Sequence, residues 1–133
     1  MGSVVVDTSI VLAILDPRDA HHRGAFQAWR QIRAAGDRIV LPATALAEVL
    51  VGASRVGEEA VRTADAFVDS VVDSVQDIDR VIARSAARYR AQFASLRLPD
   101  ALVIAVGSVT NADAVLTADQ RWSRVDRRIR VLR

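Results

Sequence analysis

The sequence contains no cysteine, which excludes disulfide frameworks, thiolate metal sites and cysteine nucleophiles together. All 18 basic residues are arginine, so lysine is absent as well. Without lysine the chain cannot form a phosphate-binding loop ending in Gly-Lys-Ser/Thr, a Schiff-base site or a receiver-type phosphorylation site. Glycine (6) and proline (3) are scarce. The composition therefore excludes disordered and collagen-like classes.

The sequence also lacks the roughly 20-residue apolar run that a membrane span needs, and its first residues lack the order of a signal peptide. With 133 residues, of which 51% are hydrophobic, the chain is large enough to bury one core. We predict a single domain over residues 1–133, a cytoplasmic location, and neither a membrane nor a nucleotide cofactor as a partner.

Short β-branched runs alternate with helical patterns along the chain. Predicted strands lie at residues 4–6, 38–41, 71–76, 114–117 and 129–132. Predicted helices lie at residues 10–15, 17–35, 42–54, 58–69, 79–93 and 99–110. Thr8 and Ser9 are suited to cap the first helix, and Gly36 and Asn111 to end two others. Such alternation predicts an α/β fold, a three-layer α/β/α sandwich with a parallel sheet of about four to five strands.

Three carboxylates stand alone in segments that should be buried. Each is the only charged residue of an apolar stretch: Asp7 in residues 1–15, Glu48 in residues 39–54 and Asp100 in residues 98–112. Burying an unpaired carboxylate costs several kcal/mol at least. We therefore expect a cationic group to compensate these acids.

The predicted topology brings the isolated acids to one place, because functional groups of an open parallel sheet gather outside the carboxyl ends of its strands. Asp7 lies at that end of the first strand, and Asp119 lies just past the fourth. Asp100 and Glu48 lie near the starts of their helices. Asp113 enters its strand from the opposite end. We expect the first four to share one rim and Asp113 to lie elsewhere.

Structural alternatives exist for three of these acids. Asp7 could be a helix N-cap, Asp100 could simply favour the positive end of a helix dipole, and Asp119 could cap a turn. Glu48 has no such alternative, because a capping box would need the acid where Ala47 stands.

Clustered carboxylates without lysine or cysteine nearby favour a hard divalent cation, Mg²⁺ or Mn²⁺. Such a site suits phosphodiester hydrolysis, in which the cation activates water and clamps phosphoryl oxygens. The predicted catalytic and metal-binding residues are Asp7, Glu48, Asp100 and Asp119, with Ser9 and Thr117 as supporting hydroxyls. Candidate phosphate contacts are Arg97, Arg121 and Arg124. An ordinary solvated surface is the alternative for these arginines.

Four segments, taken in order, resemble the acidic motifs of PIN-domain ribonucleases, and within them the short stand-alone toxins of VapBC-type toxin–antitoxin pairs. These segments are residues 4–9 (VVVDTS), 42–50 (PATALAEVL), 98–105 (LPDALVIA) and 115–119 (VLTAD). The resemblance covers essentially the whole chain. One departure is that a single acid follows Thr117, so this fourth ligand would act through water.

The resemblance implies a metal-dependent endoribonuclease that cuts structured RNA such as tRNA or ribosomal RNA. It also implies a homodimer and inhibition by a cognate VapB-type antitoxin whose C-terminal segment covers the acidic groove. It assigns the metal site to the same four acids. Two rival functions remain open: a catalytically idle interaction domain and an RNA-processing nuclease that is not a toxin. A phosphatase on a related fold is disfavoured, because Ser9 stands where its second acid would be and lysine is absent.

The formal net charge of +2 hides an uneven distribution. Setting the four proposed ligands aside leaves 12 of the 16 acidic residues against 18 arginines, a surplus of six positive charges on the rest of the chain. We therefore expect an acidic pocket inside a basic surface that is compatible with phosphate.

Overall fold

Five parallel strands form the middle layer of the molecule. The computed structural model describes residues 2–133. The strands are β1 (Ser3–Val6), β2 (Arg38–Pro42), β3 (Ser74–Gln76), β4 (Ala114–Thr117) and β5 (Ile129–Val131). They lie in the order β3-β2-β1-β4-β5, and every neighbouring pair is parallel. All carboxyl ends therefore face one edge of the sheet, and the predicted α/β fold with a parallel sheet is confirmed.

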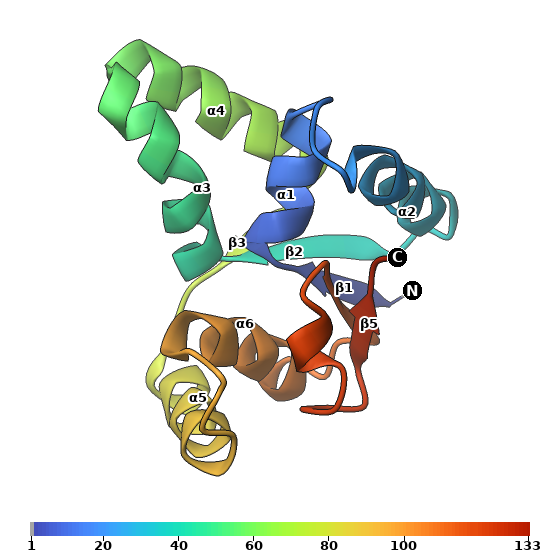
Figure 1. The fold of residues 1–133 in the computed structure, drawn as a ribbon, viewed down its shortest axis with the longest axis vertical. Coiled ribbons are helices and arrows are strands. Elements are labelled where there is room, and N and C mark those ends of the chain that lie inside the picture. Colours follow the sequence, from blue (N-terminus) through green and yellow to red (C-terminus); the bar gives the residue numbers. More distant parts are fainter. Residues whose placement is uncertain (1) are drawn as a thin grey trace.

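Helices cover both faces of this sheet (Figure 1). On one face lie α1 (Thr8–Leu15) and α2 (His22–Ala34), and on the other lie α6 (Leu98–Val109) and, packed against it, α5 (Arg80–Gln92). The helices α3 (Ala43–Val56) and α4 (Glu58–Val71) pack against each other and extend away from the sheet. A short 3-10 turn, η1 (Gln120–Trp122), follows β4. None of the helices in residues 2–133 is long and apolar enough to cross a membrane.

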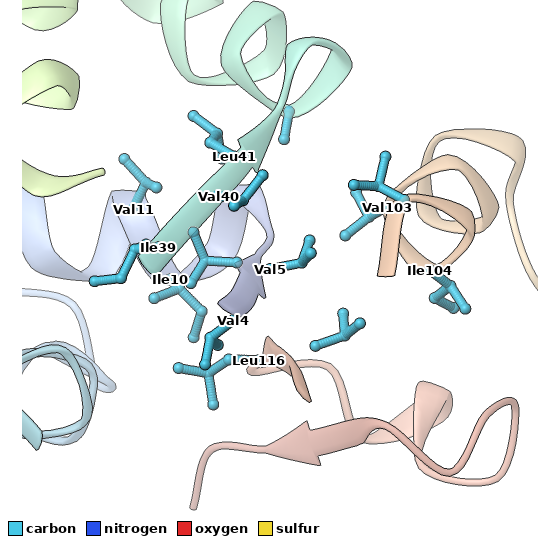
Figure 2. Packing of buried hydrophobic residues seen from close by; sticks show 14 of the residues in the cluster. Val4, Val5, Ile10, Val11, Ile39, Val40, Leu41, Val103, Ile104 and Leu116 are labelled. Atoms are coloured by element: carbon cyan, nitrogen blue, oxygen red, sulfur yellow. The ribbon is translucent and has the colours of Figure 1, made fainter. Parts of the chain in front are cut away.

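The core consists of two apolar layers, one on each side of the sheet. Figure 2 shows Ile10 and Val11 of α1 on one side and Val103 and Ile104 of α6 on the other. All four side chains are buried. The contact between α6 and β4 is close, because a Cβ added at Gly107 would overlap the side chain of Val115. This packing holds the C-terminal part of α6 close against β4.

The start of α2 differs from the sequence-based prediction. The helix begins at His22, and residues 16–21 form turns instead of the predicted helix from residue 17. The Asp16 carboxylate accepts the Arg18 backbone N–H at 2.9 Å, and the Asp19 carboxylate accepts that of His21 at 2.8 Å. Such side-chain bonds to the backbone stabilise turns in competition with a helix.

Residues with a positive φ follow the ends of three helices. Gly36 after α2 has φ 77° and Asn111 after α6 has φ 53°, which confirms both predicted helix ends. Gly57 has φ 151° and separates α3 from α4. The third strand is shorter than predicted, because Val71 still belongs to α4 and leaves only Ser74–Gln76 for β3.

Candidate active site

Asp7 follows β1 directly and lies at the carboxyl edge of the sheet with only 6% of its surface exposed. Its Oδ1 accepts the Ser9 hydroxyl at 2.5 Å and the Ile10 backbone N–H at 3.3 Å, and its Oδ2 accepts the Thr117 hydroxyl at 2.8 Å. Asp7 is thus the N-cap of α1, as its structural alternative predicted. The predicted capping by Thr8 and Ser9 is wrong, because the Ser9 hydroxyl binds the carboxylate instead.

The buried position of Asp7 changes its acidity. Loss of hydration raises the pKa of Asp7 to about 6, although its three hydrogen bonds favour the ionised form. The neighbouring Asp100 carboxylate adds to the increase in pKa. An ionised Asp7 is therefore poorly compensated by its own surroundings, and an added positive charge nearby would stabilise it.

Asp100 lies in the first turn of α6, beside an arginine from the turn before it. Arg97 Nε lies 3.2 Å from Asp100 Oδ2 and Arg97 Nη2 lies 3.3 Å from Asp100 Oδ1, so the guanidinium grips both carboxylate oxygens. The Asp100 side chain is 13% exposed and that of Arg97 is 63% exposed. This position also suits the positive end of the helix dipole, as the structural alternative for Asp100 predicted.

Asp119 lies two residues past β4 and forms a similar pair with Arg121. Arg121 Nη2 lies 2.7 Å from Asp119 Oδ2, and Arg121 Nε lies 3.0 Å from Asp119 Oδ1. The Arg121 backbone N–H also donates to Asp119 Oδ1 at 2.9 Å, so Asp119 caps the η1 turn as its alternative predicted. The Arg121 guanidinium lowers the pKa of Asp119.

Glu48 is exposed, which contradicts the expectation that it stands in a buried segment. The reason is that α3 buries only the stripe that contains Ala45 and Val49, and Glu48 lies on the neighbouring side that faces solvent. Glu48 still lies close enough to the rim for its carboxylate to contribute, after that of Asp100, to the raised pKa of Arg97.

Hydrogen bonds join the ends of β1 and β4 into one rim. The Thr117 hydroxyl donates to Asp7 and accepts the Asp119 backbone N–H at 3.0 Å. The Ser9 hydroxyl accepts the Ala118 backbone N–H at 3.1 Å. Both supporting hydroxyls therefore orient the Asp7 carboxylate and link it to the backbone that follows β4.

Asp113 lies at the opposite end of β4. It binds the Ser3 backbone N–H at 2.9 Å, at the start of β1, and so lies away from the rim as predicted.

The cationic compensation that the sequence predicts comes, for two of the acids, from the chain's own arginines. The sequence predicts Arg97 and Arg121 as phosphate contacts but does not predict their pairing with Asp100 and Asp119. Their spacing of three and two residues from these acids was the available signal. Arg124 is exposed and forms no ion pair within residues 2–133.

The donor set of the rim suits a hard divalent cation, because it consists of carboxylate and hydroxyl oxygens. Within residues 2–133, no three acidic or histidine side chains are grouped so that they could hold one metal ion. Mg²⁺ commonly uses one or two carboxylates and completes its shell with water and substrate phosphate. Asp7 and the neighbouring Asp100 therefore fit this requirement.

The fold is shared with several toxin–antitoxin proteins of known structure. A toxin–antitoxin complex from Klebsiella pneumoniae matches with a TM-score of 0.74 and 22% identity over 96% of both chains. VapBC2 from Rickettsia felis, bound to a DNA fragment from its promoter, matches with a TM-score of 0.74 and 13% identity over 98% of this chain and 99% of that chain.

A third structure is VapC20 from Mycobacterium tuberculosis, described as a toxin that cleaves the sarcin-ricin loop. It matches with a TM-score of 0.65 and 20% identity over 84% of this chain and 86% of that chain. No curated protein matches the chain in sequence. The PIN domain family model matches residues 4–128, which includes all four candidate acids. The chain belongs to the PIN domain family.

Proposed function

We propose that the protein is a metal-dependent endoribonuclease that acts as the VapC-type toxin of a type II toxin–antitoxin pair. The observation that carries this proposal is the rim at the carboxyl ends of β1 and β4, where the buried Asp7 carboxylate lies near Asp100 and is linked through the Thr117 hydroxyl to the Asp119 backbone N–H. Membership of the PIN domain family supports nuclease chemistry, and the structural likeness to toxins, one of them RNA-cleaving, supports the biological role.

The residues of the rim have distinct roles in this proposal. Asp7 and Asp100 would hold Mg²⁺ or Mn²⁺ directly, with Asp119 and Glu48 contributing through water. A divalent cation at this place lowers the pKa of a water molecule and neutralises charge on the phosphate. The proposed RNA phosphate contacts are Arg97, Arg121 and Arg124.

Ser9 and Thr117 act on Asp7 instead of on the substrate. Their hydroxyls hold both oxygens of its carboxylate in one orientation, at 2.5 Å and 2.8 Å. Because those hydrogen bonds also connect the start of α1 to the end of β4, they hold these two parts of the rim in a fixed relative position. Structured RNA, tRNA or ribosomal RNA, is the proposed substrate.

A VapB-type antitoxin is the proposed protein partner, because structures that resemble this chain include VapBC complexes. The helices α1 and α3, which lie next to the rim, expose apolar side chains that a partner could cover. Leu12 and Leu15 of α1 are 39% and 41% exposed, and Val51 of α3 is 45% exposed. A homodimer, implied by the family resemblance, completes the proposed assembly.

Controlled expression in a bacterial host tests this function. We expect brief induction of the wild type to arrest growth and to create new 5′ ends at few positions in tRNA or ribosomal RNA. Asp100→Asn should abolish both effects, because it removes a charge that the cation needs. The matched control is Asp65→Asn on α4, an exposed aspartate outside the rim, which should behave as the wild type.

Normal growth with unchanged RNA ends would overturn the toxin function and favour an idle interaction domain. New RNA ends without growth arrest would favour an RNA-processing nuclease that is not a toxin. Equal effects from the wild type and Asp100→Asn would contradict the assignment of the site.

A further inference from the structure

Arg97 and Arg121 contact the carboxylates of Asp100 and Asp119, which a metal ion would also use. We propose that Arg97 and Arg121 are built-in counter-ions: they compete with the divalent cation for Asp100 and Asp119, and they become free to bind RNA phosphate when the cation takes their place. This inference rests on the proposed function only in taking the rim as a metal site. It concerns how the chain's own residues set the affinity of that site.

In each of the two ion pairs, the guanidinium contacts both oxygens of the carboxylate. Arg97 reaches both oxygens of Asp100 at 3.2 Å and 3.3 Å, and Arg121 reaches both oxygens of Asp119 with its shortest contact at 2.7 Å. A guanidinium that contacts both oxygens already neutralises the carboxylate and blocks the approach to it from that side, which disfavours a second cation there. A metal ion and these arginines therefore compete for the same carboxylate oxygens.

The two arginines also match a divalent cation in charge. Asp7, Asp100 and Asp119 bring three negative charges to the rim, and two guanidiniums bring the same two positive charges as one divalent cation. Replacing the two guanidiniums by one divalent cation therefore leaves the net charge of the rim unchanged.

The two arginine side chains are much more exposed than the carboxylates that they contact. The side chains of Arg97 and Arg121 are 63% and 67% exposed, whereas their partners are 13% and 23% exposed. Exposed ion pairs contribute little free energy, so the arginines can leave without disturbing the fold. Asp119 keeps its bond to the Arg121 backbone N–H, and Asp100 keeps its position in the first turn of α6. Once released, the guanidiniums lie at the edge of the cation site, where a phosphodiester would approach.

Calorimetric titration of the purified, metal-free protein with Mn²⁺ alone tests the competition without measuring catalysis. We expect Arg97→Gln and Arg121→Gln each to bind Mn²⁺ about two- to fivefold more tightly than the wild type, as the loss of one exposed ion pair implies. The double variant should bind more tightly than either. Thermal melts in EDTA check that the variants remain folded.

Arg124→Gln is the matched control, because it removes the same charge from a neighbouring exposed arginine that forms no ion pair within residues 2–133. Its Mn²⁺ affinity should stay within the error of the wild-type value. Equal gains in Arg124→Gln and in the two rim variants, or no gain in the rim variants, would overturn the competition while leaving the metal site intact. Failure of the wild type and of every variant to bind Mn²⁺ would overturn the metal site itself, and the inference with it.

Discussion

Asp7 carries the largest electrostatic penalty at the candidate site. It is almost completely buried, its partners are neutral hydroxyls and one backbone N–H, and its pKa is raised to about 6. An ordinary aspartate in an unfolded chain has a pKa near 3.8. Folding therefore places a poorly solvated carboxylate at the place where the proposed cation would bind, and stability is lowered in favour of function.

This penalty has a defined dependence on pH. Between about pH 4 and pH 6 the folded protein keeps the Asp7 proton that the unfolded chain has lost, so the contribution of Asp7 to stability falls as the pH rises. Below pH 4 both states are protonated at this residue. Above pH 6 both are ionised, and the penalty is constant at about 3 kcal/mol.

Asp7→Asn should remove that penalty, because the amide keeps the shape of the side chain and carries no charge. In EDTA we expect the variant to be more stable than the wild type at pH 7.5 by up to about 3 kcal/mol. The difference should shrink as the pH falls from 6 to 4. Urea unfolding at several pH values measures it, and a difference that does not change with pH would contradict the raised pKa.

Isolation in an apolar stretch was a good guide to some site residues and a poor guide to others. Asp7 and Asp100 are isolated in the sequence and lie within the fold near each other, as expected. Glu48 is equally isolated but exposed, because isolation along the chain does not say which side of a helix faces solvent. The arginine pairs depend on side-chain geometry in three dimensions, and composition alone could not separate them from ordinary surface arginines. Metal ligation by the four acids stays a prediction.

At the scale of elements, the position of Asp100 depends on how closely α6 lies on the sheet. Gly107 makes this approach possible, since a Cβ there would overlap the fully buried side chain of Val115. Val115 is short and branched and is enclosed by the core, so it has little freedom to move away. A larger residue at position 107 would push α6 away from β4, and a shift of the whole helix would displace Asp100.

Two alanine variants separate this packing effect from helix propensity. Gly107→Ala and Gly52→Ala gain the same intrinsic helix preference, about 1 kcal/mol, but a Cβ at Gly52 in α3 meets no other atom within 4 Å. We expect Gly52→Ala to be stabilised, and Gly107→Ala to unfold with a free energy about 1–3 kcal/mol below that of Gly52→Ala. Denaturant unfolding compares them, and equal stability of the two variants would show that α6 does not depend on this contact.

The elements themselves were largely predictable from hydrophobic pattern. The β-branched runs of β1, β2 and β4 and the apolar start of α6 follow local rules that the fold reinforces. The start of α2 was not predictable from this pattern, because Asp16 and Asp19 form turns through bonds to the backbone that compete with a helix. The capping of α1 by Asp7 was available as an alternative in the sequence, but the choice between Asp7 and Ser9 needed the structure.

At the scale of the whole molecule, an acidic rim lies in a chain whose other residues are strongly basic. The rim acids are held at one edge because every strand of the sheet runs in the same direction. The surplus of arginine on the remainder favours association with a polyanion. Not every arginine contributes to that surface, since the Arg128 side chain is 13% exposed and its Nε donates to the Ala112 carbonyl at 3.1 Å.

In our proposal the rim is a single cation-dependent site for phosphodiester cleavage. Cleavage of mixed tRNA and ribosomal RNA by purified protein, with Mn²⁺ or with EDTA, tests it most directly. We expect the wild type and Asp65→Asn to cleave only with Mn²⁺. The cleavage rate of Asp7→Asn should be lower than that of the wild type by a factor of about 100 or more. Cleavage by Asp7→Asn at the wild-type rate, or cleavage that persists in EDTA, would contradict the account.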